Sequence, residues 1–245
     1  MNNILELNNV DYTYHTPQGE TAALSDISLC IEDGEFISIV GPSGCGKSTL
    51  LSIIADLLPP DNGTVTFNGN NIGYMLQKDH LFEWRTIYKN VTLGLEIQHK
   101  LDKPHIENIN AMLTTYGLER FKNSHPSELS GGMRQRAALI RTLALEPDLL
   151  LLDEPFSALD YQTRLQVCDD IYGIIKKEGK TAILVTHDLS EAISIGGRVV
   201  VLTKRPGKMK KIIDVKYPNE YSSPFLARNA PDFKKYFNEV WKEVK

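Results

Sequence analysis

The sequence predicts an α/β protein with a mixed, largely parallel sheet, an N-terminal antiparallel β-subdomain and an inserted helical subdomain. Two observations support this fold class. Short apolar runs bounded by turn residues dominate the first third of the chain, and similar runs return near residue 150 with helical stretches between them. In the middle of the chain, apolar residues instead recur at helical intervals. Because alternating strands and helices are typical of parallel sheets, we expect the later strands to be parallel.

Five runs in the first third are predicted strands, at residues 4–10, 27–31, 36–40, 65–67 and 72–75. Asp33 and Gly34 separate the second run from the third. An Asp-Gly pair between two alternating apolar runs is the strongest short-range sequence signal for a β-hairpin. We therefore expect a hairpin between residues 31 and 36.

The middle and the second half of the chain differ in their apolar spacing. Helical spacing predicts helices at residues 86–95, 105–116 and 131–145, and compact apolar runs predict strands at 149–152, 181–185 and 199–202. Leu165, Cys168 and Ile175 also lie at helical spacing, and Gly179 follows where a helix C-cap belongs. Cys168 is therefore a predicted core residue.

The end of the chain contains a basic cluster and an aromatic stripe. The basic cluster consists of Lys204, Arg205, Lys208, Lys210 and Lys211. We interpret it as the solvated end of a hairpin, and contact with anionic lipid headgroups is the alternative. The stripe has helical spacing and consists of Phe233, Tyr236, Phe237, Val240 and Trp241. We expect the stripe to pack on the protein's own body, with a partner site as the alternative.

The composition excludes several classes of protein. The 245 residues include 27 Lys and Arg against 31 Asp and Glu, so the formal net charge is −4, which predicts no nucleic-acid partner. The three cysteines are far apart and in no CxxC spacing, which disfavours a disulfide framework or a zinc site and favours a reducing cytosol. We recognise no signal peptide and no apolar stretch near the roughly 20 residues that span a bilayer.

Residues 41–48 fit the phosphate-loop pattern. The loop follows the predicted strand at 36–40 and opens a predicted helix at 47–55. Its glycines let backbone N–H groups converge on a β-phosphate, Lys47 brings positive charge to the β- and γ-phosphates, and Ser48 offers a hydroxyl to Mg²⁺. The sequence therefore predicts a P-loop NTPase core. Its candidate nucleotide-binding residues are Gly41, Pro42, Ser43, Gly44, Cys45, Gly46, Lys47, Ser48 and Thr49.

Two adjacent acids, Asp153 and Glu154, end the apolar run at 149–152. This places both carboxylates at the carboxyl edge of a buried parallel strand, where the phosphate loop of such a sheet also lies. Asp153 would organise the water shell of Mg²⁺, and Glu154 could polarise the attacking water. A strand that merely ends in surface acids is the alternative, but the phosphate loop favours the catalytic interpretation.

A serine and two glycines at positions 130–132 open the predicted helix at 131–145. Ser130 would cap this helix, and the free N–H groups of Gly131 and Gly132 would bind an anion. The segment Leu-Ser-Gly-Gly-Met-Arg-Gln-Arg at 129–136 resembles the signature of the ATP-binding cassette (ABC) family, with Met133 in place of the commonest residue, glutamine. The resemblance implies that two domains pair head to tail and that each signature helix contacts the ATP bound by the other domain.

The resemblance also implies roles for residues at strand ends. Gln77 resembles the glutamine-loop residue that reaches Mg²⁺ and the attacking water, and His187 resembles the switch histidine that contacts the γ-phosphate. Asp160 ends a segment similar to the loop that crosses the dimer interface. Tyr14 resembles the aromatic residue that stacks on adenine, with Tyr12 as the rival. The implied catalytic residues are Glu154, His187, Gln77 and Lys47, and the implied Mg²⁺ ligands are Ser48, Gln77 and Asp153.

Within the family, residues 76–86 and the methionine-bearing signature are most like importers of nitrate, sulfonate, taurine and related solutes, including vitamin precursors. The resemblance implies an ATP-hydrolysing subunit at the cytoplasmic face of the cell membrane. Its implied partners are transmembrane permease subunits, a second ATPase subunit that is most simply identical, and, indirectly, an extracytoplasmic solute-binding protein. The implied single ABC ATPase domain has its core at 1–82 and 145–217, a helical subdomain at 83–144 and a C-terminal helical tail at 218–245.

The sequence leaves three alternative functions open. An exporter subunit is the main rival within the family. A soluble ABC ATPase working on DNA or ribosomes would carry a long coiled coil or two cassettes, which 245 residues do not accommodate. A small-molecule or nucleoside kinase would leave the helix that Ser130 caps and the switch-like His187 unexplained.

We expect Cys45 to be reactive, because it lies inside the phosphate loop at the start of a predicted helix. The helix dipole favours a thiolate at such a position. We therefore expect a thiol reagent to inhibit hydrolysis and ATP to protect the protein.

Overall fold

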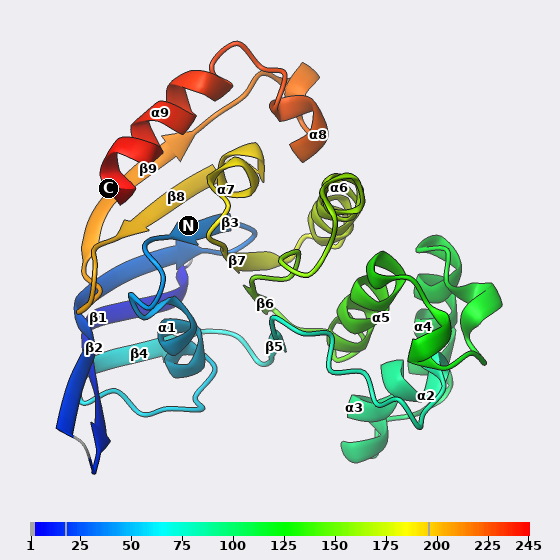
Figure 1. Ribbon diagram of the computed structural model, residues 1–245. Helices are drawn as coiled ribbons and strands as arrows, with labels where there is room; N and C mark the ends of the chain where they lie inside the picture. The colour runs from blue at the N-terminus through cyan, green and yellow to red at the C-terminus, as the bar shows by residue number, and fades with distance from the viewer. Residues whose placement is uncertain (1–2, 18, 196) are drawn as a thin grey trace.

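The computed structural model describes residues 3–17, 19–195 and 197–245, which form two sheets and the helices around them (Figure 1). The smaller sheet is antiparallel and has the strand order β2-β1-β4. Its strands are β1 (Asn3–Thr16), β2 (Gly19–Glu32) and β4 (Asn62–Phe67). This is the predicted N-terminal antiparallel subdomain.

The larger sheet has six strands in the order β5-β6-β7-β3-β8-β9. The first five in this order run parallel, and β9 pairs antiparallel with β8. The predicted mixed, largely parallel sheet is thereby confirmed. The strands are β3 (Phe36–Val40), β5 (Ile72–Met75), β6 (Leu149–Asp153), β7 (Thr181–Val185), β8 (Gly197–Leu202) and β9 (Met209–Val215).

The hairpin predicted at Asp33 and Gly34 is wrong. A turn with Gly34 at φ +77° is present, but β2 belongs to the small sheet and β3 pairs in parallel with β7 and β8 of the large one. The turn forms a hydrogen bond with a residue that is distant in the sequence, because the Gly34 N–H donates to Thr181 Oγ1 (2.8 Å). The strand after the turn is apolar enough to be buried on both faces, and burial between parallel neighbours outweighs the local turn signal.

The helices follow the predicted order with changes at their ends. The predicted helix at 86–95 is two short helices that meet at Thr92, whose hydroxyl bonds to Glu96 Oε1 (2.7 Å). Gly179, with φ +62°, lies after the helix that contains Cys168, as expected for a C-terminal glycine. The helices are α1 (Lys47–Ile54), α2 (Ile87–Val91), α3 (Leu93–Ile97), α4 (Lys103–Thr115), α5 (Gly131–Leu143), α6 (Tyr161–Lys177), α7 (Leu189–Ile195), α8 (Pro224–Ala227) and α9 (Phe233–Val244).

Alternate residues of the central strands pack on opposite sides of the large sheet. In β6, Leu149 and Leu151 belong to a cluster with α1 and the small sheet, whereas Leu150 and Leu152 pack with α5 and α6. Helices α2 to α5 gather at one end of the molecule (Figure 1). Cys168 is 1% exposed in the second cluster, which confirms it as a core residue.

The C-terminal helix α9 packs against β8, β9 and α7. Val240 is fully buried there, and Phe233, Tyr236 and Phe237 pack beside it, as predicted for the stripe, whereas Trp241 is 48% exposed. The basic cluster is not one surface. Lys210 and Lys211 form ion pairs with Glu243 and Glu239 of α9, and Arg205 lies elsewhere, on the cleft described below. None of the helices in the described ranges is both long and apolar enough to cross a membrane.

Candidate active site

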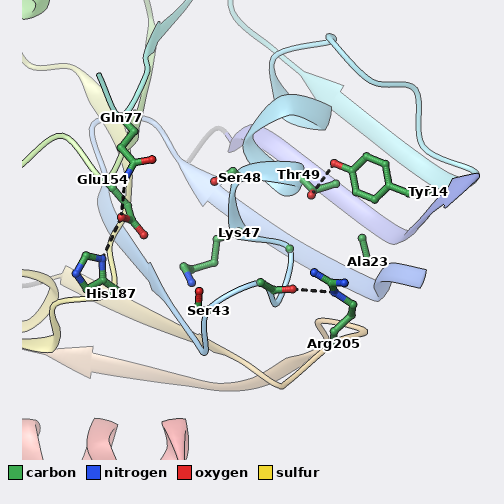
Figure 2. Close-up of a pocket in the computed structure, with 12 residues that line it drawn as sticks. Tyr14, Ala23, Ser43, Lys47, Ser48, Thr49, Gln77, Glu154, His187 and Arg205 are labelled. Atoms are coloured by element: carbon green, nitrogen blue, oxygen red, sulfur yellow. Dashed lines mark hydrogen bonds and ion pairs between the residues drawn. The ribbon is translucent and has the colours of Figure 1, made fainter. Parts of the chain in front are cut away.

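A cleft of about 720 Å³ lies at the carboxyl ends of the parallel strands (Figure 2). In such a sheet, this edge is where loops from different strands converge on a ligand. The cleft is lined by Tyr14, Ala23, Ser43, Gly44, Gly46, Lys47, Ser48, Thr49, Gln77, Glu154, His187 and Arg205.

The phosphate loop connects β3 to α1 and forms the floor of the cleft. Gly46 is the N-cap of α1 and has φ +102°, a conformation that favours glycine. The ammonium of Lys47 donates to the carbonyls of Gly41 (2.9 Å) and Pro42 (3.1 Å). The side chain is therefore folded along its own loop, next to the amide groups that open α1. A positive charge beside a helix N-terminus is an anion site.

Asp153, at the end of β6, receives a hydrogen bond from Ser48. Its Oδ1 lies 3.1 Å from Ser48 Oγ, and the Tyr74 hydroxyl lies 3.5 Å from its Oδ2. Burial raises the pKa of the Asp153 carboxyl and, with the Asp153 charge, raises that of Tyr74 to about 12. A partly desolvated carboxylate beside a hydroxyl is an oxygen donor set that suits Mg²⁺. In the described ranges, no three His, Cys, Asp or Glu side chains come together as a group that could hold a metal ion.

Glu154, Gln77 and His187 come together on one side of the phosphate loop (Figure 2). Oε2 of Glu154 lies 3.3 Å from Gln77 Nε2 and 3.0 Å from His187 Nδ1. The three residues follow β5, β6 and β7, which are neighbours in the sheet. Glu154 has φ +45°, in the left-handed region, and its N–H donates to Val185 O (2.8 Å). This backbone directs the carboxylate into the cleft, and strained backbones of this kind cluster at functional sites.

Tyr14 stands on the other side of the loop, and Tyr12 does not line the cleft. Tyr14 is 40% exposed, and its hydroxyl forms a hydrogen bond with Thr49 Oγ1 (3.0 Å). Tyr12 supports it edge-on, with the ring centroids 5.0 Å apart and the planes at 84°. Of the two candidates, Tyr14 is the one with a ring open to a ligand.

The residues of the signature segment lie outside this cleft. Ser130 is the N-cap of α5 and accepts from the Met133 N–H (3.4 Å), and Asp160 is the N-cap of α6 and accepts from the Thr163 N–H (3.1 Å). The two helix starts are packed together, because a Cβ on Gly132 would lie 2.9 Å from Val167 Cγ2. Ser130, Gly131, Gly132 and Asp160 therefore form a second group, separate from the phosphate loop of the same chain.

The structure contradicts the expected Cys45 thiolate. The side chain is 1% exposed, and burial raises the pKa of the thiol despite the nearby Lys47 ammonium (3.9 Å). Burial in an apolar cluster stabilises the neutral thiol, and this effect outweighs the Lys47 ammonium and the backbone N–H groups of the loop, which favour the anion. The side chain of Cys45 therefore points away from the cleft side of the loop and packs in the apolar core.

Three residues at or next to the cleft were not predicted as site residues. Ala23, which carries no chemical signal, and Arg205, which was predicted to lie in the basic cluster, both line the cleft. Ser157 lies beside it and accepts a hydrogen bond from Gln77 (3.4 Å). No sequence signal could have placed Arg205 here, because its partner Gly44 is 161 residues away.

Comparison with known proteins identifies the relatives of this chain. Residues 24–157 match the family described as ABC transporter. An uncharacterized ABC transporter ATP-binding protein of Bacillus subtilis, YtlC, is 46% identical over 98% of this chain and 95% of its own length. The taurine import ATP-binding protein TauB of Jannaschia sp. is 40% identical over 90% of this chain and 82% of its length. The nitrate import ATP-binding protein NrtD of Synechocystis sp. is 36% identical over 96% of this chain and 93% of its own length.

A solved structure shares the fold. It is the dimeric post-hydrolysis state of the ATP-binding cassette MJ0796 bound to ADP and Pi, with a TM-score of 0.73 and 31% identity. The match covers 87% of this chain and all of the other. The fold class predicted from the sequence is confirmed by this likeness.

Proposed function

The chain belongs to the ABC transporter family and is an ATP hydrolase, and we propose that it energises the import of a small solute by a membrane ABC transporter. Import is supported by the relatives that are named for taurine and nitrate import. The proposed solute class is a small anion or zwitterion such as nitrate, a sulfonate or taurine, or a vitamin precursor. The observation that carries the catalytic part is the convergence of Glu154, Gln77 and His187 beside the phosphate loop.

The proposed nucleotide site has its phosphates on the loop at 41–48 and its adenine against the exposed ring of Tyr14. Lys47 and the amide groups at the start of α1 would bind the β- and γ-phosphates. Ser48, Asp153 and Gln77 would hold Mg²⁺, which when bound neutralises phosphate charge. The hydroxyl and the carboxylate already face each other at 3.1 Å, which fits this assignment.

Glu154 is the proposed general base. Its carboxylate accepts one hydrogen bond from Gln77 and lies against His187, so it is oriented from both sides before substrate arrives. In the proposed step, a water molecule between this carboxylate and the γ-phosphate loses a proton to Glu154 as its oxygen attacks phosphorus. The bond between phosphorus and the β–γ bridging oxygen breaks, and ADP leaves with the electron pair of that bond. His187 and Gln77 would position the γ-phosphate and the attacking water.

The proposed site is completed by a second copy of the chain. Ser130, Gly131, Gly132 and Asp160 lie outside the chain's own cleft, although the Ser130 cap leaves a helix N-terminus suited to phosphate. A head-to-tail dimer would bring this second group to the γ-phosphate of the partner's ATP. The dimeric form of the related cassette supports the pairing.

The proposed membrane contacts lie where the core at 1–82 meets the helical subdomain at 83–144. Trp84 is 75% exposed beside Phe82, with ring centroids 4.7 Å apart, and both lie close in sequence to Gln77. We assign this surface to transmembrane permease subunits, which would keep the chain at the cytoplasmic face of the membrane. An extracytoplasmic solute-binding protein would act through those subunits.

Light scattering of the Glu154→Gln variant with and without Mg-ATP tests the shared site. We expect a monomer that becomes a dimer with Mg-ATP, because binding is retained while hydrolysis is slowed. The added substitution Ser130→Arg should abolish dimerisation without abolishing ATP binding, since Ser130 does not line the chain's own cleft. Dimerisation that persists in the double variant would refute the head-to-tail site.

The direction of transport needs the assembled complex. Reconstituted with its permease subunits in vesicles, the protein should drive ATP-dependent uptake of solute from the side opposite the ATPase. If each of the proposed solutes instead moved away from the side that carries the ATPase, the chain would be assigned to an exporter.

A further inference from the structure

Arg205 lies on the cleft, yet none of the roles proposed above uses it. It belongs to the turn between β8 and β9, and its side chain reaches the phosphate loop from below in Figure 2. Its Nε donates to the carbonyl of Gly44 (2.9 Å). A Cβ on Gly44 would lie 3.1 Å from Nη2 of Arg205, so the glycine allows the guanidinium to lie directly on the loop.

The turn that carries Arg205 is fastened to its surroundings. The Gly207 N–H donates to Ala23 O (2.8 Å), and the Ser25 N–H donates to Gly207 O (2.9 Å). Gly207 also packs on the phosphate loop, because a Cβ there would lie 2.2 Å from Cys45 O. The position of the guanidinium is therefore set by β2 and by the loop, and not by the solvent-exposed turn alone.

The charge of Arg205 is available to a ligand. Lys210 and Lys211, in the strand that follows, are neutralised by Glu243 and Glu239. Within the described part of the chain, Arg205 makes no ion pair, and only its Nε forms a hydrogen bond. Its two Nη groups thus present planar donors beside the cleft, in the arrangement that binds phosphate oxygens well.

The position along the cleft indicates which part of a nucleotide these donors would meet. Gln77, Glu154 and His187 lie on one side of Lys47, whereas Tyr14 and Arg205 lie on the other (Figure 2). The first side is the proposed hydrolytic end. Arg205 is therefore at the end of the cleft where the nucleoside would lie. It contacts Gly44 and is on the opposite side of Lys47 from the proposed site of the terminal phosphate.

We propose that Arg205 is a further nucleotide-binding residue, whose guanidinium binds the α-phosphate of the nucleotide and contributes to affinity but not to hydrolysis. This inference rests on the proposed nucleotide site. It implies that mono-, di- and triphosphates benefit equally from Arg205, because all three carry the α-phosphate.

The test is displacement of a fluorescent ADP analogue by ADP, by a non-hydrolysable ATP analogue and by AMP. Arg205→Gln should weaken all three by a similar factor, about tenfold, the effect of one charge-assisted hydrogen bond pair in a partly exposed site. The turnover number at saturating ATP should stay within about twofold of the wild type, because a binding contact shared by ground and transition states does not change it. Affinity for ADP should also become less sensitive to salt, since one screened charge contact is lost.

Lys208→Gln is the matched control, because it removes one positive charge from the same turn but not from the lining of the cleft. It should leave all three affinities unchanged. Should Arg205→Gln lower the unfolding temperature without nucleotide, Arg205→Met carries the same test, since it retains the aliphatic part of the side chain.

The outcomes separate this inference from the proposed function. A wild-type protein that binds no nucleotide would refute the proposed site itself. If the wild type binds but the Arg205 variants match it within twofold, only the role of Arg205 is refuted. A loss of affinity confined to the ATP analogue would place the guanidinium at the γ-phosphate and overturn the α-phosphate assignment. An equal loss of affinity in Lys208→Gln would show that the effect comes from the net charge of the turn and not from a contact made by Arg205.

Discussion

Nδ1 of His187 lies 3.0 Å from Oε2 of Glu154, and the two residues follow the neighbouring parallel strands β7 and β6. The same carboxylate oxygen lies 3.3 Å from Gln77 Nε2. A carboxylate contacted from two strands, on a backbone with φ +45°, is oriented by the sheet and not by the ligand. Its contribution can therefore be measured by substitutions that retain its shape.

Glu154→Gln retains the shape of the side chain but not its basicity. We expect steady-state phosphate release to fall by about 10²–10⁴-fold, the usual contribution of a general base. The dissociation constant for ATP should change little, because Glu154 is outside the phosphate loop. Glu119→Gln, an exposed substitution away from the cleft, should retain full turnover. Unchanged phosphate release in Glu154→Gln would exclude this residue as the base.

Lys47→Ala should act on binding rather than on the chemical step. Lys47 is only 7% exposed, and removal of its ammonium takes away a charge-assisted contact, so we expect the dissociation constant for ATP to rise by roughly 10–100-fold. Equilibrium binding of a non-hydrolysable analogue measures this directly. Lys103→Ala, at an exposed position on α4, is the control and should bind normally. Normal affinity in Lys47→Ala would show that phosphates do not bind at this loop.

Cys45 should react slowly with thiol reagents at neutral pH. Burial raises the pKa of its thiol above the ordinary value of 9.0, so the thiolate fraction at a given pH is lower than for an ordinary thiol. In a Cys30→Ser background, which removes the exposed cysteine, the labelling rate should keep rising as the pH passes 9.0. Rapid labelling of Cys45 at pH 7 would contradict its burial.

Glu191 should make stability depend on pH. Its side chain is buried beside Thr186, whose hydroxyl donates to Oε2 (2.6 Å), and burial raises the pKa of the carboxyl above its ordinary 4.5. A raised pKa in the folded state means that folding favours the protonated form, so this contribution to stability is complete below pH 4.5 and is lost as pH rises through the folded value. Glu191→Gln should therefore gain stability relative to the wild type over that pH interval.

Denaturant unfolding at a series of pH values measures this difference. The free energy of unfolding of Glu191→Gln minus that of the wild type should increase with pH and then level off. Glu119→Gln, at an exposed position, should show no comparable trend. A difference that is flat or that falls with pH would mean that the carboxyl is ionised without penalty in the folded protein.

Most of the strands and helices could be predicted because their signals are local. β6 and β7 were predicted within one residue of their observed ends, since an uninterrupted apolar run of this length is buried on both faces of a sheet. The expected parallel arrangement also allowed Asp153 and Glu154 to be placed at the edge of the sheet where the phosphate loop lies. The helix at 86–95 was predicted as one because periodicity does not register the break at Thr92.

The sequence by itself determined most of the strands and helices and predicted the phosphate loop and the acids after β6, because period, turn chemistry and motif spacing depend on neighbours along the chain. Only the tertiary structure decided that β2 and β3 enter different sheets, that Cys45 is desolvated and that Arg205 rests on Gly44 across 161 residues. Each of these depends on which distant segments compete to bury the same surface. That competition is resolved by packing of the whole chain, and no local pattern records its result.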